Sequence, residues 1–207
     1  MPGESSVDFT FKVVLLGDIN VGKTSIFQRY RDGTFQDYRR TTTGIDSCTK
    51  IKQFENTKIA AVLWDTAGTE KFRTVTQNYY RNSNACLLVY SIDEPDSLAC
   101  LGQWVNDANT YSESAIKILV GNKTDKRNLV DHRKVEEFAT HHNCDLIFQV
   151  SAKRGEGIDE MFTTLAHKLL EREMRKRQSV SLFENEAYDI LTPKLTDKIK
   201  LNESCCT

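Results

Sequence analysis

The sequence predicts an α/β fold: a six-stranded, mostly parallel sheet with one antiparallel edge strand and helices on both faces. Along most of the 207 residues, short apolar runs alternate with segments of helical periodicity, an order typical of parallel sheets. Residues 45–54 and 58–64 are separated only by the short turn 55–57, which predicts an antiparallel hairpin. The apolar run 11–16 leads through a glycine-containing loop into a helical segment, the start of a strand–helix–strand unit.

Each element follows from its local pattern. The continuous apolar runs 85–91 and 116–120 are typical of central parallel strands, which are buried on both faces. Residues 32–44 are polar and irregular, so we expect a loop there. The expected strands are 11–16, 45–54, 58–64, 85–91, 116–120 and 146–150. The expected helices are 22–31, 72–80, 97–111, 133–141 and 158–177.

Composition limits the partners and the compartment. The net charge of −1 gives no bulk attraction to nucleic acid, and we expect no nucleic-acid partner. The six cysteines do not suggest a disulfide framework, because four of them lie singly in patterned segments, and a reducing compartment fits. Residues 1–8 do not resemble a signal peptide. No apolar run approaches the ~18 residues that span a bilayer, and Pro2 argues against myristoylation.

Residues 17–24 carry the most specific motif. They read Gly-Asp-Ile-Asn-Val-Gly-Lys-Thr, the G-x-x-x-x-G-K-[ST] spacing of a phosphate-binding loop; a chance Gly-Lys turn is the alternative for this motif alone. Glycines let the backbone curl around a phosphate chain, so that successive N–H groups point at the anion. Lys23 can reach the β- and γ-phosphates, and the Thr24 hydroxyl can ligate Mg²⁺. The nucleotide contacts expected here are Ile19, Asn20, Val21, Gly22, Lys23, Thr24 and Ser25.

A second loop supplies the remaining metal and γ-phosphate groups. Asp65-Thr66-Ala67-Gly68 ends the third expected strand, where parallel sheets bind their ligands. Asp65 can hold Mg²⁺ through water, and the Gly68 N–H can meet the γ-phosphate. Thr42 is placed to add a second hydroxyl to the metal. The expected Mg²⁺ ligands are therefore Thr24, Thr42 and Asp65.

Two further loops predict guanine recognition. Asn122-Lys123-Thr124-Asp125 follows an expected strand, and the Asp125 carboxylate can accept from the N1–H and the 2-amino group of guanine, a donor pair that adenine lacks. We expect Asn122 to tie loops together and the Lys123 stem to cover the base; an ordinary solvated loop is the alternative for this motif alone. Backbone N–H groups of Ser151, Ala152 and Lys153 can meet the guanine O6. The expected ligands are thus GTP and GDP.

These motifs, in this chain order, identify a resemblance to the Ras-superfamily small GTPases, and specifically to the Rab family. The resemblance covers residues 11–177 and implies a single P-loop GTPase domain there, a flexible N-terminus over 1–10, and a flexible tail over 178–207. The Rab-specific signs are Thr43-Gly44-Ile45-Asp46, Trp64-Asp65-Thr66-Ala67-Gly68, Glu70-Lys71-Phe72-Arg73-Thr74-Val75, Tyr79-Tyr80-Arg81, Leu88-Val89-Tyr90-Ser91-Ile92 and Cys205-Cys206-Thr207.

The resemblance implies a hydrolase that converts GTP to GDP and phosphate and acts as a switch in vesicle-mediated protein transport. Implied partners are effectors, an exchange factor, a GTPase-activating protein, a GDP-dissociation inhibitor and a prenylation escort protein. The GTPase domain would be monomeric. Geranylgeranyl groups on Cys205 and Cys206 would attach the chain stably, because two lipids anchor where one does not. The implied location is the cytoplasmic face of a Golgi, endosome or vesicle membrane, with cycling through the cytosol.

The resemblance also implies site residues. Lys23, Thr42 and Gly68 would act in hydrolysis together with Thr69, which stands where the family has a water-orienting glutamine. The effector-binding surface implied by the motifs consists of Thr43, Gly44, Ile45, Asp46, Trp64, Phe72 and Tyr79.

Two departures from the Rab pattern, Thr69 and Ile19, bear on mechanism, and two lesser ones are Ser47 and Asn82-Ser83. Thr69 is too short to reach an in-line water, and Ile19 replaces a small residue beside the γ-phosphate. We therefore expect slow intrinsic hydrolysis; harmless drift absorbed by the loops is the alternative. An activating protein of this family can supply arginine and glutamine in trans. Ser47 stands where Rabs usually have phenylalanine, which changes an effector-facing strand.

Three functions compete on these features. The leading one is a GTP/GDP switch whose segments 38–46 and 68–80 are ordered by the γ-phosphate and Mg²⁺. The second is a mostly GTP-loaded, non-hydrolysing scaffold or binding module, which Ile19 and Thr69 favour. The third is a P-loop phosphotransferase, against which the base-recognition motifs and the lack of an acceptor-binding lid argue.

Overall fold

The structure is a computed structural model that describes residues 6–37, 42, 44–66 and 80–191, with side chains up to residue 179. Its contacts divide the chain into two units, residues 1–169 and 170–207, which are described separately. All six strands belong to the first unit.

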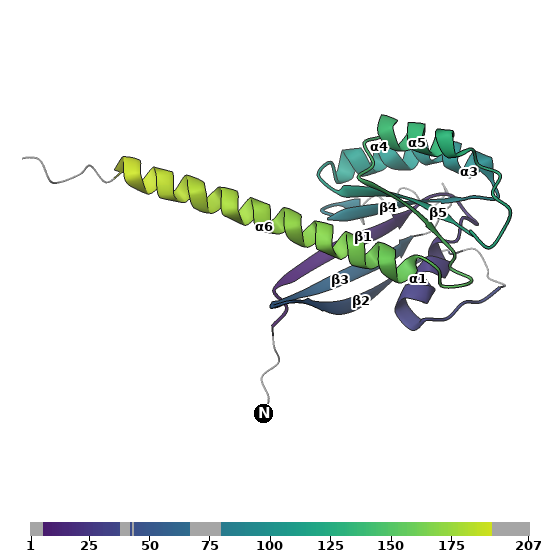
Figure 1. Cartoon of the computed structure of the whole chain (residues 1–207), viewed down its shortest axis with the longest axis horizontal. Coiled ribbons are helices and arrows are strands. Elements are labelled where there is room, and N and C mark those ends of the chain that lie inside the picture. Colours follow the sequence, from purple (N-terminus) through teal and green to yellow (C-terminus); the bar gives the residue numbers. More distant parts are fainter. Residues whose placement is uncertain (1–5, 38–41, 43, 67–79, 192–207) are drawn as a thin grey trace, which may run out of the picture. The chain divides into compact units, whose positions relative to one another are not determined.

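The sheet is six-stranded and confirms the expected architecture (Figure 1). Its strand order is β2-β3-β1-β4-β5-β6. The edge strand β2 pairs antiparallel with β3, from Ile45 opposite Thr66 to Phe54 opposite Thr57, and the other four pairings are parallel. The strand bounds are β1 (Phe9–Leu16), β2 (Ile45–Phe54), β3 (Thr57–Thr66), β4 (Ala85–Ser91), β5 (Ile116–Asn122) and β6 (Leu146–Val150).

Helices cover both faces of the sheet. On one face, α3, α4 and α5 lie together, and Trp104, Val105 and Val135 pack with strand residues into one buried cluster (Figure 1). On the other face, Tyr30 of α1 stacks on Phe162 of α6 with ring centroids 3.8 Å apart. The helix bounds are α1 (Lys23–Asp32), α3 (Pro95–Ala99), α4 (Leu101–Tyr111), α5 (His132–His141) and α6 (Ile158–Leu191).

Two helices differ from the sequence expectation. The helix expected over 97–111 is two helices, α3 and α4, which meet at Cys100. The helix expected to end at residue 177 continues to Leu191, so residues 178–191 are helical and not a linker. No glycine or proline interrupts the chain from Ile158 until Pro193, and a residue before proline is driven out of the helical conformation. The helix expected over 72–80 lies outside the described residues except for Tyr80.

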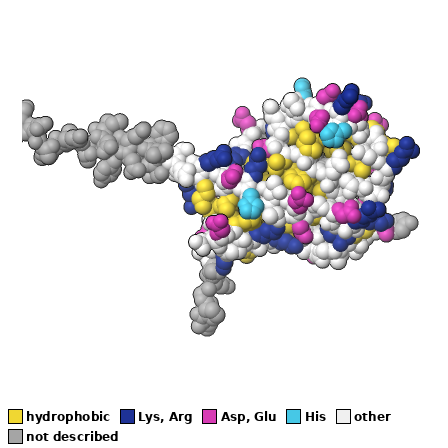
Figure 2. Space-filling view, in the orientation of Figure 1, with side chains coloured by type: hydrophobic (Ala, Val, Ile, Leu, Met, Phe, Trp, Pro, Cys, Tyr) yellow, Lys and Arg dark blue, Asp and Glu magenta, His cyan; other side chains and the backbone are white. Residues whose placement is uncertain are grey.

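The parallel strands place their loops at one edge of the sheet. β1, β3, β4, β5 and β6 run in the same direction, so the loops that follow them meet beyond their carboxyl ends. The surface away from this edge mixes charges: on the face in Figure 2, acidic and basic side chains are scattered among one another.

Candidate functional site

A cavity of about 340 Å³ opens at the carboxyl edge of the sheet. This volume lies within the range of small-molecule sites. The structure brings together around it most of the residues singled out from the sequence: Ile19, Asn20, Gly22, Lys23, Thr24, Ser25, Thr42, Asn122, Lys123, Asp125, Ala152 and Lys153. Val21, Asp65 and Ser151 are buried in the same loops and do not line the cavity.

The loop after β1 follows a path that two of its glycines make possible. Gly17 and Gly22 have positive φ angles of 142° and 95°. A Cβ atom on Gly17 would lie 2.2 Å from the Val89 carbonyl oxygen, and one on Gly22 would lie 2.2 Å from the Asn122 Nδ2. Any side chain at either position would therefore force the loop away from β4 and β5.

Lys23 begins α1 and is buried at the floor of this loop. Its Nζ donates to the carbonyl oxygens of Gly17 (2.8 Å) and Asp18 (2.7 Å). Burial lowers the pKa of Lys23 to about 8, although the nearby carboxylates of Asp65 and Asp18 oppose the shift. A poorly solvated cation at a helix N-terminus gains more than an exposed lysine from an incoming anion.

Three side chains near this lysine carry oxygen atoms that could serve as metal ligands. The Thr24 and Thr42 hydroxyl oxygens are 2.8 Å apart and hydrogen-bonded. Asp65 is buried at the end of β3. Mg²⁺ prefers oxygen ligands and keeps several waters, so two hydroxyls and one carboxylate fit this ion. No group of three His, Cys, Asp or Glu side chains that could hold a metal occurs among the residues that the structure describes.

Asn122 joins three segments of the site through one buried amide. Its Nδ2 donates to the Val21 carbonyl oxygen at 2.9 Å, and its Oδ1 accepts from the Ala152 N–H at 3.2 Å. The phosphate-binding motif, the end of β5 and the loop after β6 are thereby held in one arrangement.

Asp125 and Ser151 form a second link between these loops. The Ser151 hydroxyl donates to the Asp125 Oδ1 at 2.6 Å and accepts from the Arg154 N–H at 3.0 Å. Asp125 itself lines the cavity. The carboxylate is thus oriented by a buried hydroxyl of the neighbouring loop.

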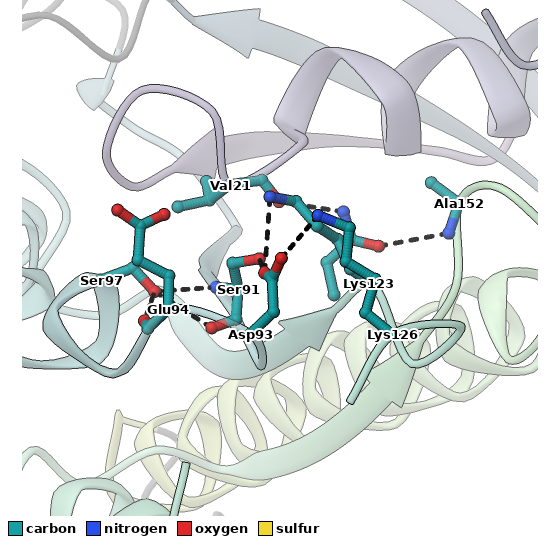
Figure 3. A network of polar contacts seen from close by, with 9 residues as sticks. Val21, Ser91, Asp93, Glu94, Ser97, Lys123, Lys126 and Ala152 are labelled. Atoms are coloured by element: carbon teal, nitrogen blue, oxygen red, sulfur yellow. Dashed lines mark hydrogen bonds and ion pairs between the residues drawn. The ribbon is translucent and has the colours of Figure 1, made fainter. Parts of the chain in front are cut away.

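Sequence reasoning missed Asp93, which organises the lysines of the site (Figure 3). Its carboxylate lies 3.6 Å from the Lys123 Nζ and accepts hydrogen bonds from Lys126 and Ser91. Burial opposes ionisation, but these hydrogen bonds and the two lysine charges lower the pKa of Asp93 to about 2. Its place just after a central strand could have marked it, because the site loops after β1, β5 and β6 occupy such places.

Other cavity residues were also missed. Phe35, Gln36 and Asp37 line the cavity from the segment expected only to be irregular, and Thr66 and Lys126 line it beside predicted residues. Ile19, singled out as a departure, is 44% exposed and lines the cavity.

The expected effector residues that the structure describes, Gly44, Ile45, Asp46 and Trp64, do not line the cavity. Ile45 and Asp46 begin β2, just after Gly44, and Asp46 accepts from Arg31 at 2.9 Å. Trp64 lies on β3, paired with Ser47, and the Lys12 Nζ sits 5.6 Å from its ring centroid. Thr43, Gly68, Thr69, Phe72, Tyr79, Cys205 and Cys206 lie outside the described residues. Within the described part of the chain, no helix has the length and apolarity that crossing a membrane requires.

Comparison with known proteins identifies the family of this chain. The model of the Ras family matches residues 12–171. Human Ras-related protein Rab-30 is 37% identical over 166 residues, which cover 79% of this chain and 81% of that protein. Rab-19 of Xenopus laevis is 35% identical over 183 residues, covering 83% and 84%, and Rab-1D of Dictyostelium discoideum is 36% identical over 168, covering 80% and 82%.

The family match covers residues 12–171, most of the chain, and the relatives at 35–37% identity are all Rab proteins. The chain therefore belongs to the Ras family, as a Rab-type small GTPase.

Proposed function

We propose that this protein is a GTP/GDP switch that recruits effectors to an endomembrane in vesicle-mediated transport. The observation that carries the proposal is the cavity, into which four separate loops bring twelve of the residues expected from the sequence. The effectors, exchange factor, activating protein, dissociation inhibitor and escort protein expected for a Rab would act on this switch. Cys205 and Cys206 would carry the geranylgeranyl anchors that let it cycle between the cytosol and a Golgi, endosome or vesicle membrane.

The base would bind between Asp125 and the loop 151–153. Asp125, oriented by Ser151, accepts from the guanine N1–H and 2-amino group, and the Lys123 stem covers the ring while Asp93 holds its ammonium. The Ala152 and Lys153 loop lies at the O6 edge. Adenine presents no donor pair to Asp125, so the site selects guanine.

The phosphates would bind in the loop after β1. N–H groups of residues 19–25 surround them, and Lys23 turns from the Gly17 and Asp18 carbonyls toward the β- and γ-phosphates. Thr24, Thr42 and Asp65 would hold Mg²⁺, because their two hydroxyls and one carboxylate are oxygen ligands. When bound, the ion neutralises charge that develops between the phosphates during hydrolysis. Thr42 is then held only while the γ-phosphate is present, which couples the effector residues 43–46 to the nucleotide.

Intrinsic hydrolysis would be slow. The attacking water must be held in line with the γ-phosphate, and Thr69 is too short to do so. Ile19 supports this proposal, because its exposed β-branched side chain occupies space at the phosphate end of the cavity. The same two residues favour the second candidate, a mostly GTP-loaded scaffold that rarely hydrolyses.

The nucleotide retained by purified full-length protein tests the proposal. We expect GDP or GTP in equimolar amount, and ATP or an empty site would refute it. Asp125→Asn should lose GTP affinity and gain xanthosine triphosphate, because the new amide faces the carbonyl that xanthine has at position 2. Asp131→Asn is the matched control, since Asp131 is an exposed helix cap that asparagine can replace. Single-turnover hydrolysis of bound GTP then separates the switch from the scaffold.

A further inference from the structure

Arg29 belongs to none of the motifs, yet its side chain reaches the cavity wall. It lies on α1, half-buried, and its guanidinium donates to three backbone carbonyl oxygens. Nε donates to Ala152 at 2.9 Å, Nη2 to Lys153 at 2.7 Å, and Nη1 to Gly33. Arg29 and Ala152 are 123 residues apart in the sequence, so this contact exists only in the folded chain.

These carbonyls belong to two segments whose residues form walls of the cavity, the loop after β6 and the chain that follows α1. Ala152 and Lys153 line it from the loop after β6. Gly33 ends α1 at a φ of 69°, and its N–H donates back to the Arg29 carbonyl at 3.0 Å. The chain that continues from Gly33 lines the cavity with Phe35 and Asp37. One side chain therefore joins both walls to the helix that begins with Lys23.

The hydrogen-bond acceptors of Arg29 indicate a structural role for its side chain. Within the described part of the chain, no ion pair links Arg29 to a carboxylate. The N–H donors of its planar guanidinium bond only backbone carbonyl oxygens in the described residues. The Arg29 side chain therefore orients chain segments and does not neutralise a charge. The second tie between the walls is weaker: the Lys153 Nζ lies 3.2 Å from the Asp37 carboxylate, and both side chains are more than half exposed.

We propose that Arg29 is a positioning residue. Its hydrogen bonds, called the latch below, hold the loop after β6 and the chain that follows α1 together and thereby slow the release of nucleotide. The inference rests on the proposed guanine-nucleotide function. The Ala152 N–H is already held by Asn122, and Arg29 holds the carbonyl of the same residue. A base enclosed by this loop and by residues 33–37 leaves when the two walls separate, which breaks the Arg29 hydrogen bonds. The latch therefore raises the barrier to dissociation and does not affect the first encounter.

Rates of binding and release of a fluorescent GDP analogue test the latch in full-length protein. Arg29→Met keeps the stem and removes the donors; we expect release to become about tenfold faster, the size expected for losing charge-assisted hydrogen bonds. The association rate should stay within about twofold. Arg31→Met is the matched control. Arg31 lies on the same helix, its guanidinium bonds Asp32 and Asp46, and its side chain does not line the cavity.

Two further readouts separate positioning from plain stability. Amide hydrogen exchange over residues 151–155 of the GDP-bound protein should speed up in Arg29→Met and not in Arg31→Met. Arg29→Lys should release GDP at an intermediate rate, because an ammonium can donate to these carbonyls but cannot span both walls.

Four results would overturn the inference. The first is a wild-type release rate in folded Arg29→Met, and the second is an equal acceleration of release in Arg31→Met. The third is a slower association rate that accounts for the change in affinity. The fourth applies if Arg29→Met does not fold, and it is a wild-type release rate in Arg29→Lys. Wild-type protein that does not bind the GDP analogue would instead refute the proposed function, so the two failures are distinguishable.

Discussion

Asn122→Ala tests most directly how the site is held together. The amide is 1% exposed and makes two hydrogen bonds, to the Val21 carbonyl at 2.9 Å and from the Ala152 N–H at 3.2 Å. Alanine leaves both backbone groups without these partners, and each unsatisfied buried group costs about 1–3 kcal/mol. The free energy of unfolding should therefore fall by roughly 2–6 kcal/mol, a large share of the ~5–15 kcal/mol typical of a domain.

Urea unfolding of nucleotide-free protein measures this loss without a contribution from ligand binding. Asn106→Ala is the control: Asn106 is exposed on α4, and its replacement should change stability by less than about 0.5 kcal/mol. GDP release should also accelerate in Asn122→Ala, because the loops before α1 and after β6 are no longer joined. A loss below about 1 kcal/mol together with a wild-type release rate would refute the reasoning, since the amide would then be dispensable to both loops.

Three further predictions follow from the site. Thr24→Asn should lose Mg²⁺-dependent GTP affinity and favour GDP, because the hydroxyl beside Thr42 is gone; titration of GTP with and without Mg²⁺ measures this, and equal affinities would contradict the metal role. Thr69→Gln should accelerate single-turnover hydrolysis, and adding Ile19→Ser should accelerate it further, more so with an activating protein; an unchanged rate would show that neither residue limits turnover. Asp93 has a folded-state pKa of about 2, below its ordinary 3.8, so it stabilises the fold above pH 3.8 and that contribution disappears as the pH falls toward 2. The stability difference between wild type and Asp93→Asn should therefore shrink as the pH falls from 3.8 toward 2 in urea titrations, and a constant difference would exclude the linkage.

Local residue chemistry was enough to predict the order of elements and most of the cavity. The alternation of apolar runs and helical segments predicts a parallel sheet, and the short turn before β3 predicts its antiparallel edge. Gly17, Gly22 and Lys23 could be assigned from spacing because a phosphate loop needs positive φ angles and a cation at fixed positions. These features depend on neighbours within a few residues, and one sequence contains that information.

The helices were predicted less well, because their ends depend on weak signals. Cys100 separates α3 from α4 without a glycine or proline to mark the break. α6 continues past residue 177 although its amphipathic pattern fades there. No glycine or proline that would end the helix occurs before Pro193.

The tertiary structure alone decided which distant groups hold the cavity in shape. Asn122 was expected to tie loops together, but only the fold shows that its partner is a carbonyl 101 residues away. Arg29 meets two carbonyls in the loop after β6, and Asp93 contacts two lysines from the loop after β5. No spacing rule predicts such pairs, because backbone carbonyls have no sequence signature and any arginine or aspartate could serve. The sequence by itself determined which side chains and backbone groups are available to bind a ligand, through residue types at fixed spacings. Folding determined what holds those residues in place, because parallel strands bring separate loops to one edge where long side chains can span them.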